Sequence, residues 1–144
     1  MILCDVNILV YAYREDADRH PEYREWLEDV VNRPDSFGFS TLVLSGFLRV
    51  VTHARIFEPP SPLADARRFI EPIVERPNAI QVNPGYRHWE IFMDLCRRVE
   101  AKGNLIPDAY LAALSIESGC EWITADRGFS RFPGLKWRSP LAET

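Results

Sequence analysis

The sequence predicts an α/β fold in which helices cover both faces of a short parallel sheet, a three-layer α/β/α sandwich. Short apolar segments alternate along the chain with longer segments whose apolar residues recur at helical spacing. This alternation is typical of a parallel sheet covered on both faces. The chain has 144 residues, enough for a sizeable core, so we expect one domain spanning residues 1–144.

The elements follow from local patterns. Short apolar runs predict strands over residues 1–4, 36–40, 79–84, 120–125 and 136–139. Helical spacing predicts helices over residues 6–14, 16–34, 41–54, 63–76, 86–103 and 107–119. Pro21 and Pro107 suit first helical turns, Ser40 suits an N-cap, and Gly103 and Gly119 suit helix ends. A loop with one helical turn is expected over residues 126–135.

Composition excludes several classes of protein. No apolar run is long enough to span a membrane, and no signal peptide is visible, so we expect a cytoplasmic protein without a membrane partner. The three cysteines are too far apart for a zinc knuckle and are expected to be reduced. No glycine-rich phosphate loop is present, so no nucleotide cofactor is expected. A net charge of −4 argues against a broadly basic nucleic-acid-binding surface, but not against a nucleic-acid enzyme.

Three acids fall at junctions between predicted elements. Asp5 follows the first strand, Asp126 follows the strand ending near residue 125, and Asp108 lies in the first turn of a helix. In open parallel sheets, sites form beyond the carboxyl ends of the strands, where helix N-termini also gather. Taken alone, Asp108 could complement a helix dipole and Asp126 could be an ordinary turn residue. Asp5 is harder to explain in this way, because a lone charge between two buried segments is unfavourable.

Clustered together, these acids fit a divalent cation. Two carboxylates about 4 Å apart repel by about 4 kcal/mol at an effective dielectric constant of 20, and a cation between them removes that repulsion. Oxygen ligands favour Mg²⁺ or Mn²⁺ over zinc. Such an ion can neutralise charge that develops on a phosphate group during its reaction.

At these residues the sequence resembles PIN-domain proteins, specifically the VapC-type toxins of bacterial toxin–antitoxin pairs. The resemblance spans nearly the whole chain and rests on three stretches: "LCDVNILVYA", "FSTLVLSGFLRVVTHARIF" and "GNLIPDAYLAALSIESGCEWITADRGFSRFPGLKW". It implies a Mg²⁺- or Mn²⁺-dependent endoribonuclease that cuts structured RNA such as tRNA or rRNA. It also implies a homodimer and a cognate VapB-type antitoxin as partners.

The resemblance also assigns roles to individual residues. Asp5, Asp108 and Asp126 match the acidic metal ligands of the family, and Asn7 and Thr124 match its supporting polar positions. Two positions depart from the family pattern.

The usual acid of the middle helix falls on Gly46, and a further acid falls on Gly128. If Gly46 is a vacated ligand position, its Cα should face the acidic pocket, and Gly46→Glu should strengthen metal binding. If it serves close helix packing, glutamate should clash there.

Two other interpretations remain. The chain could be a catalytically impaired PIN module that binds RNA or a partner protein, because of its glycines at 46 and 128. It could also be a phosphoacceptor domain, although its first motif reads D-V-N and neither lysine is suitably placed. The arginines Arg14, Arg55, Arg127 and Arg131 could each bind phosphate, although solvated surface is the ordinary role of any single one.

Overall fold

The predicted α/β sandwich is confirmed by the structure, a computed structural model that describes residues 1–142. Its strands are β1 (Ile2–Cys4), β2 (Phe37–Phe39), β3 (Ala79–Gln81), β4 (Glu121–Ile123) and β5 (Trp137–Arg138). They form one sheet in the order β3-β2-β1-β4-β5, and every neighbouring pair is parallel.

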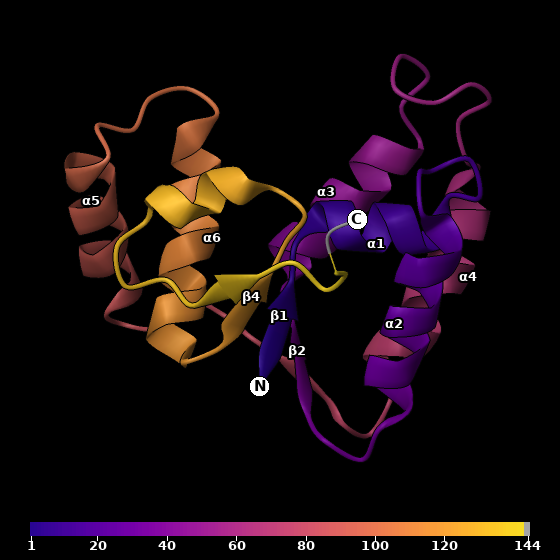
Figure 1. Ribbon diagram of the computed structural model, residues 1–144, viewed down its shortest axis with the longest axis horizontal. Coiled ribbons are helices and arrows are strands. Elements are labelled where there is room, and N and C mark those ends of the chain that lie inside the picture. The colour runs from indigo at the N-terminus through magenta and orange to yellow at the C-terminus, as the bar shows by residue number, and fades with distance from the viewer. Residues whose placement is uncertain (143–144) are drawn as a thin grey trace.

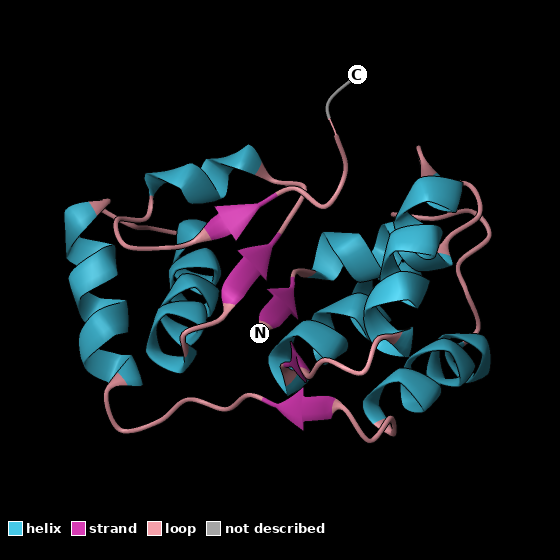
Figure 2. Ribbon diagram, turned by 60° about the horizontal axis from the view of Figure 1, so that its bottom comes forward, coloured by secondary structure: helices cyan, strands magenta, loops and turns pink. Residues whose placement is uncertain are grey.

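The helices form two layers on opposite faces of this sheet (Figures 1 and 2). They are α1 (Val6–Tyr13), α2 (His20–Asn32), α3 (Thr41–Val51), α4 (Leu63–Val74), α5 (His88–Arg98) and α6 (Leu105–Ser118). Figure 1 shows α1 to α4 together on one side of the strands and α5 with α6 on the other. A short 3₁₀ helix, η1 (Arg127–Arg131), follows β4.

The strand order creates a switch point between β1 and β4. From β1 the chain first adds β2 and β3 on one side, and only later adds β4 and β5 on the other side. The connections on the two sides place their helices on opposite faces, and in open parallel sheets ligand sites form at such a point, beyond the carboxyl ends of the strands. The residues that follow these two strands, Asp5 and Thr124, therefore lie side by side.

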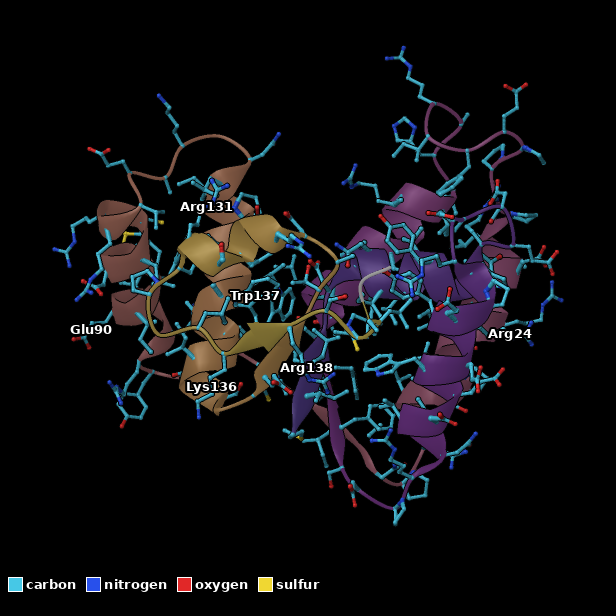
Figure 3. The ribbon with its side chains drawn as sticks, in the orientation of Figure 1. Arg24, Glu90, Arg131, Lys136, Trp137 and Arg138 are labelled. Carbon is cyan, nitrogen blue, oxygen red and sulfur yellow. The ribbon has the colours of Figure 1, made fainter. Side chains whose placement is uncertain are left out.

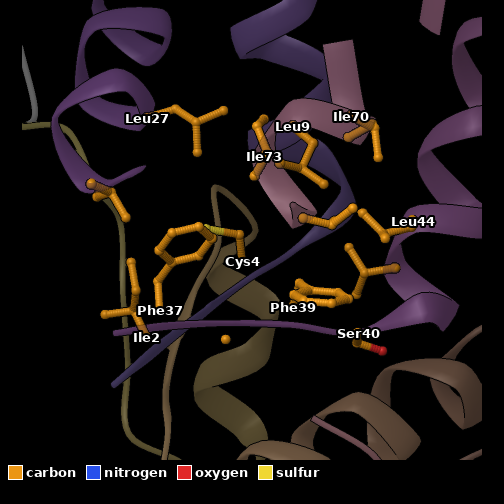
Figure 4. A pocket seen from close by; sticks show the side chains of 14 residues that line it. Ile2, Cys4, Leu9, Leu27, Phe37, Phe39, Ser40, Leu44, Ile70 and Ile73 are labelled. Atoms are coloured by element: carbon orange, nitrogen blue, oxygen red, sulfur yellow. The ribbon is translucent and has the colours of Figure 1, made fainter. Parts of the chain in front are cut away.

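The first helical layer packs on the sheet through side chains of alternate strand residues. Ile2, Cys4, Phe37 and Phe39 face α1, α2, α3 and α4 around an apolar cavity of about 30 Å³ (Figure 4). The period of two in a strand sends the neighbours Leu3 and Gly38 toward the other face. Burial of both faces explains why these strands read as continuous apolar runs rather than as alternating patterns.

Several of the predicted helix boundaries are wrong. The helix expected over residues 16–34 begins only at His20, and the one expected over residues 41–54 ends at Val51. The helix expected over residues 86–103 ends at Arg98, and Glu100, not Gly103, takes the left-handed conformation that ends it, with φ of 51°. The amide of Ala101 bonds to the carbonyl of Cys96 at 2.9 Å, which closes the helix five residues before the predicted end.

The last helix starts earlier than predicted, at Leu105 rather than Pro107. Proline is tolerated inside the first turn because the amide it lacks would have no partner there. This boundary shift leaves Asp108 within the first turn of α6, as predicted. None of the helices in the described part of the chain is long and apolar enough to cross a membrane.

Candidate metal-binding site at the β1–β4 switch point

Asp5 lies where β1 passes into α1. The amide of Asp5 donates to the carbonyl of Ile123 at 2.9 Å, so Asp5 continues the pairing of β1 with β4. One residue later the helix begins, and Asp5 Oδ1 accepts the amide of Val6 at 2.7 Å as an N-cap. Only 8% of the Asp5 surface is exposed, so the carboxylate lies almost wholly within the fold.

Thr124 holds the second oxygen of that carboxylate. Its hydroxyl donates to Asp5 Oδ2 at 2.7 Å and accepts the amide of Asp126 at 3.0 Å. Thr124 is fully buried at the end of β4. One hydroxyl thus connects the carboxylate that follows β1 to the backbone that carries the second acid.

Asn7 makes a second connection across the switch point. Its side-chain nitrogen lies 3.4 Å from both Asp5 Oδ2 and Thr124 Oγ1, and its oxygen accepts the amide of Ala125 at 3.2 Å. The two supporting residues expected from the sequence therefore act on Asp5 and on the β4–η1 segment together.

Asp126 and Asp108 act on Asp5 from other elements. Asp126 starts η1, and its Oδ1 accepts the amide of Gly128 at 2.8 Å. Asp126 is exposed, whereas Asp108 in the first turn of α6 is half-buried.

The three acids lie within one another's electrostatic field. Burial raises the pKa of Asp5 to about 6, the hydrogen bonds from Thr124 and Val6 oppose that rise, and the charges of Asp108 and Asp126 add to it. Burial and the charge of Asp126 likewise raise the pKa of Asp108, while Arg131 acts in the opposite direction. The structure therefore brings the three predicted acids to one region.

The donor set suits a hard cation. All three acidic groups supply carboxylate oxygens, the ligands that Mg²⁺ and Mn²⁺ take in proteins. Within residues 1–142, however, no three His, Cys, Asp or Glu side chains are arranged to hold one ion together. Mg²⁺ commonly keeps several waters and takes only one or two carboxylates, so an ion beside Asp5 needs just one more of these acids directly.

Gly46 contacts α1. A Cβ built on Gly46 would lie 2.9 Å from Val6 Cγ2, and its next nearest neighbours are also atoms of Val6. Real Cβ atoms essentially never come that close, so the contact of α3 with α1 requires glycine or a shift of Val6. The contact favours the packing interpretation of Gly46 over the expectation of a vacated ligand position.

The arginines that could bind phosphate have different surroundings. The guanidinium of Arg14 is bonded within the chain. It pairs with Asp16, donates to Pro59 O and Ser61 Oγ at 3.0 Å, and stacks over Phe57. Arg131 instead lies at the end of η1, where its Nε donates to Gly128 O at 2.8 Å.

The sequence profile of the PIN domain matches residues 2–135 of this chain, which include all three acids and both supporting residues. The chain belongs to the PIN-domain family. Within the family it is similar to the VapC ribonucleases. It is 45% identical over 141 residues to the VapC ribonuclease Mb2897 of Mycobacterium bovis, covering 98% of this chain and 96% of that one. The resemblance inferred from the sequence motifs is therefore confirmed.

Solved structures share the PIN fold at lower sequence identity. VapBC2 from Rickettsia felis, bound to a DNA fragment from its promoter, superposes with a TM-score of 0.69 at 20% identity. That match covers 96% of this chain and 98% of the other. VapC20 of Mycobacterium tuberculosis, described as a sarcin–ricin loop cleaving toxin, gives 0.64 at 14% identity, covering 94% and 98%. At these identities the likeness concerns the PIN fold alone.

Sequence analysis missed the backbone groups of this PIN site. The amides of Val6, Ala125, Asp126 and Gly128 each bond to a side chain of the site. The amides of Val6 and Gly128 could have been inferred from Asp5 and Asp126, since an aspartate at the start of a helix accepts amides of the next turn. The amides of Ala125 and Asp126 bond to Asn7 and Thr124, and no local signal predicts those two bonds.

Proposed function

We propose that this protein is a Mg²⁺- or Mn²⁺-dependent endoribonuclease that hydrolyses phosphodiester bonds in structured RNA of the tRNA or rRNA class. The observation that carries the proposal is the buried Asp5 carboxylate at the switch point, within the field of Asp108 and Asp126. Burial of the ionised carboxylate is unfavourable despite the hydrogen bonds from Val6 and Thr124, and a bound cation would offset that remaining cost. Membership of the VapC ribonucleases supports RNA as the substrate.

Asp5, Asp108 and Asp126 would hold the cation. A divalent ion bound there supplies Lewis acidity and neutralises charge developing on the phosphate. Val6 and Thr124 donate to both Asp5 oxygens and hold the carboxylate in one orientation. Asn7 ties this arrangement to the backbone at Ala125, so the groups from β1 and β4 keep their relative positions.

We also propose a VapB-type antitoxin as the partner of this protein in a toxin–antitoxin pair. The solved structures with this fold include VapBC complexes from Rickettsia felis, Haemophilus influenzae and Salmonella typhimurium, which supports a partner of that kind. A cytoplasmic location agrees with such a pair.

A homodimer is a further part of the proposal. Most apolar side chains of α3 and α6 cannot form its interface, because Leu111 and Leu114 of α6 and Phe47 and Val51 of α3 are buried within the chain itself. Leu42 of α3 remains 48% exposed and is available to an interface. Light scattering at micromolar concentration tests the dimer, and a monomer contradicts it.

A second candidate function is RNA binding without cleavage. It is favoured by the glycines at positions 46 and 128 and by the lack, among residues 1–142, of three ligands arranged around one centre. The two candidate functions differ in whether Mg²⁺ leads to RNA cleavage.

Cleavage of purified tRNA and rRNA, with Mg²⁺ or with EDTA, tests the two functions. The endoribonuclease predicts cuts in Mg²⁺ that disappear in EDTA and in Asp5→Asn. A matched control is Asp94→Asn, because Asp94 is a partly exposed acid of α5 that pairs with Arg98. RNA binding by the wild type, with no cleavage in Mg²⁺ or in EDTA, would leave the second function.

A further inference from the structure

Arg131 forms no salt bridge with an acidic side chain among residues 1–142, although its charge acts on Asp108. Ion pairs with aspartate or glutamate engage Arg14, Arg19, Arg24, Arg67, Arg68, Arg97, Arg98 and Arg138. Within residues 1–142, the only hydrogen bond of Arg131 is the one from Nε to the carbonyl of Gly128. Its two Nη groups are therefore available to an acceptor from outside the chain.

The guanidinium nevertheless lies beside the acidic site. A Cβ built on Gly128 would stand 2.9 Å from Asp126 Oδ1 and 3.2 Å from Arg131 Nη2. The Asp126 carboxylate and the Arg131 guanidinium thus flank the same glycine, and any side chain at position 128 would press on both. Figure 3 shows Arg131 on η1 near the N-terminal end of α6. Asp108 lies in the first turn of that helix.

The bond to Gly128 also sets the direction of the guanidinium. An arginine held at Nε keeps its planar fork in one orientation, and that fork matches two oxygens of a phosphate. An arginine that served only to neutralise the acids would pair with Asp108 or Asp126, and no such ion pair forms. A free fork at the rim of an acidic site instead gives a polyanion an attractive contact where the carboxylates repel it.

We propose that Arg131 is a substrate-contacting residue whose Nη groups bind a non-bridging phosphate oxygen of RNA next to the acidic site. Gly128 keeps the space between this arginine and Asp126 open. The inference rests on the proposed nuclease function, because it requires RNA to reach the three acids.

The salt dependence of RNA binding tests this contact. Binding of fluorescently labelled tRNA is measured by anisotropy in EDTA between about 50 and 200 mM salt, and each lost phosphate contact lowers the slope of log K against log salt by about 0.7–0.9. Arg131→Gln should lower the slope by one such step. Arg24→Gln is the matched control, because it removes the same charge from an exposed residue of α2 paired with Glu28. It should leave the slope unchanged.

Arg131→Lys separates charge from geometry. Lysine keeps the positive charge but lacks the fork, so the slope should stay near that of wild type while kcat/KM for tRNA cleavage in Mg²⁺ falls at least fivefold. If thermal melting shows that Arg131→Gln does not fold, the test rests on Arg131→Lys. A kcat/KM of Arg131→Lys equal to that of the wild type then overturns the proposal.

The outcomes distinguish the contact from the nuclease function. Equal slopes for wild type and Arg131→Gln, with cleavage intact, overturn the contact and leave the nuclease standing. An equal fall in Arg131→Gln and Arg24→Gln also overturns it, because net charge would then be the cause. If wild type binds tRNA without cutting it, and only Arg131→Gln lowers the slope, the contact stands and the nuclease fails. Absence of both binding and cleavage overturns both.

Discussion

The Thr124 hydroxyl donates to Oδ2 of Asp5 at 2.7 Å, and through this bond the ends of two adjacent strands share one polar centre. The hydroxyl oxygen of Thr124 in turn accepts the amide of Asp126, so one buried side chain is bonded to both acidic residues. The position of Asp5 relative to Asp126 therefore depends on a residue 119 positions away from Asp5 in sequence.

Thr124→Val should destabilise the protein. Valine has nearly the same shape, but it leaves a buried carboxylate oxygen and a backbone amide without their partner, which costs about 1–3 kcal/mol. Urea unfolding measures the loss. Thr124→Ser keeps the hydroxyl and should recover most of the stability, whereas an equal loss in both variants would assign the effect to packing.

Mg²⁺ or Mn²⁺ should raise the melting temperature of the wild type, because an ion that binds only the native state stabilises it. Asp5→Asn and Asp126→Asn should weaken this increase, and Asp94→Asn should not. The increase should also diminish as pH falls below about 6, where a proton competes with the ion for Asp5. Differential scanning fluorimetry during a Mg²⁺ titration measures these melting temperatures. An equal increase in wild type and both site variants would put the ion elsewhere.

Without metal, stability should decline between about pH 4 and pH 6. Burial raises the pKa of Asp5 from 3.8 in the unfolded chain to about 6 in the folded one. The stabilising contribution of the protonated group is therefore complete below 3.8 and is lost as pH rises through 6. The loss is on the order of 3 kcal/mol.

The contribution of Asp5 is isolated by subtracting the pH profile of Asp5→Asn from that of the wild type, both measured by urea unfolding in EDTA. Acids whose pKa is lowered by ion pairs, such as Asp16 with Arg14, act in the opposite direction but contribute equally to both profiles. Parallel profiles of the two proteins would contradict the raised pKa of Asp5.

Gly46→Glu should destabilise the protein with or without Mg²⁺, because any Cβ at this position meets Val6 Cγ2 at 2.9 Å. Overpacking of this kind costs about 1–3 kcal/mol. Gly46→Ala should also destabilise the protein, but by less, because alanine has a better helix propensity than glycine. Thermal melts in EDTA and in Mg²⁺ measure both variants.

Val6→Ala provides the control for Gly46, because it removes the methyl group that the new Cβ would meet. In the Val6→Ala background, Gly46→Ala should become neutral or stabilising. If Mg²⁺ instead restores the stability of Gly46→Glu and cleavage increases, the packing interpretation is wrong and the vacated ligand position is right.

Much of the fold and of the candidate site could be predicted from the sequence alone. The alternation of short apolar strands and helices predicted the parallel sheet, because burial of both faces leaves that pattern in the sequence. The positions of Asp5, Asp108 and Asp126 at element junctions predicted their meeting at one edge, because parallel strands bring their carboxyl ends together. Such local and periodic signals need no knowledge of contacts between distant residues.

Only the tertiary structure decided which side chains from distant parts of the chain contact one another. Nothing in the helix containing Gly46 indicates that Val6 of another helix presses on it, and the sequence gives no sign that Arg14 is paired while Arg131 is not. The left-handed end of α5 at Glu100, rather than at a glycine, is a similar case. These properties depend on which atoms approach after the layers pack, and close-packed interiors make such contacts specific to the folded chain.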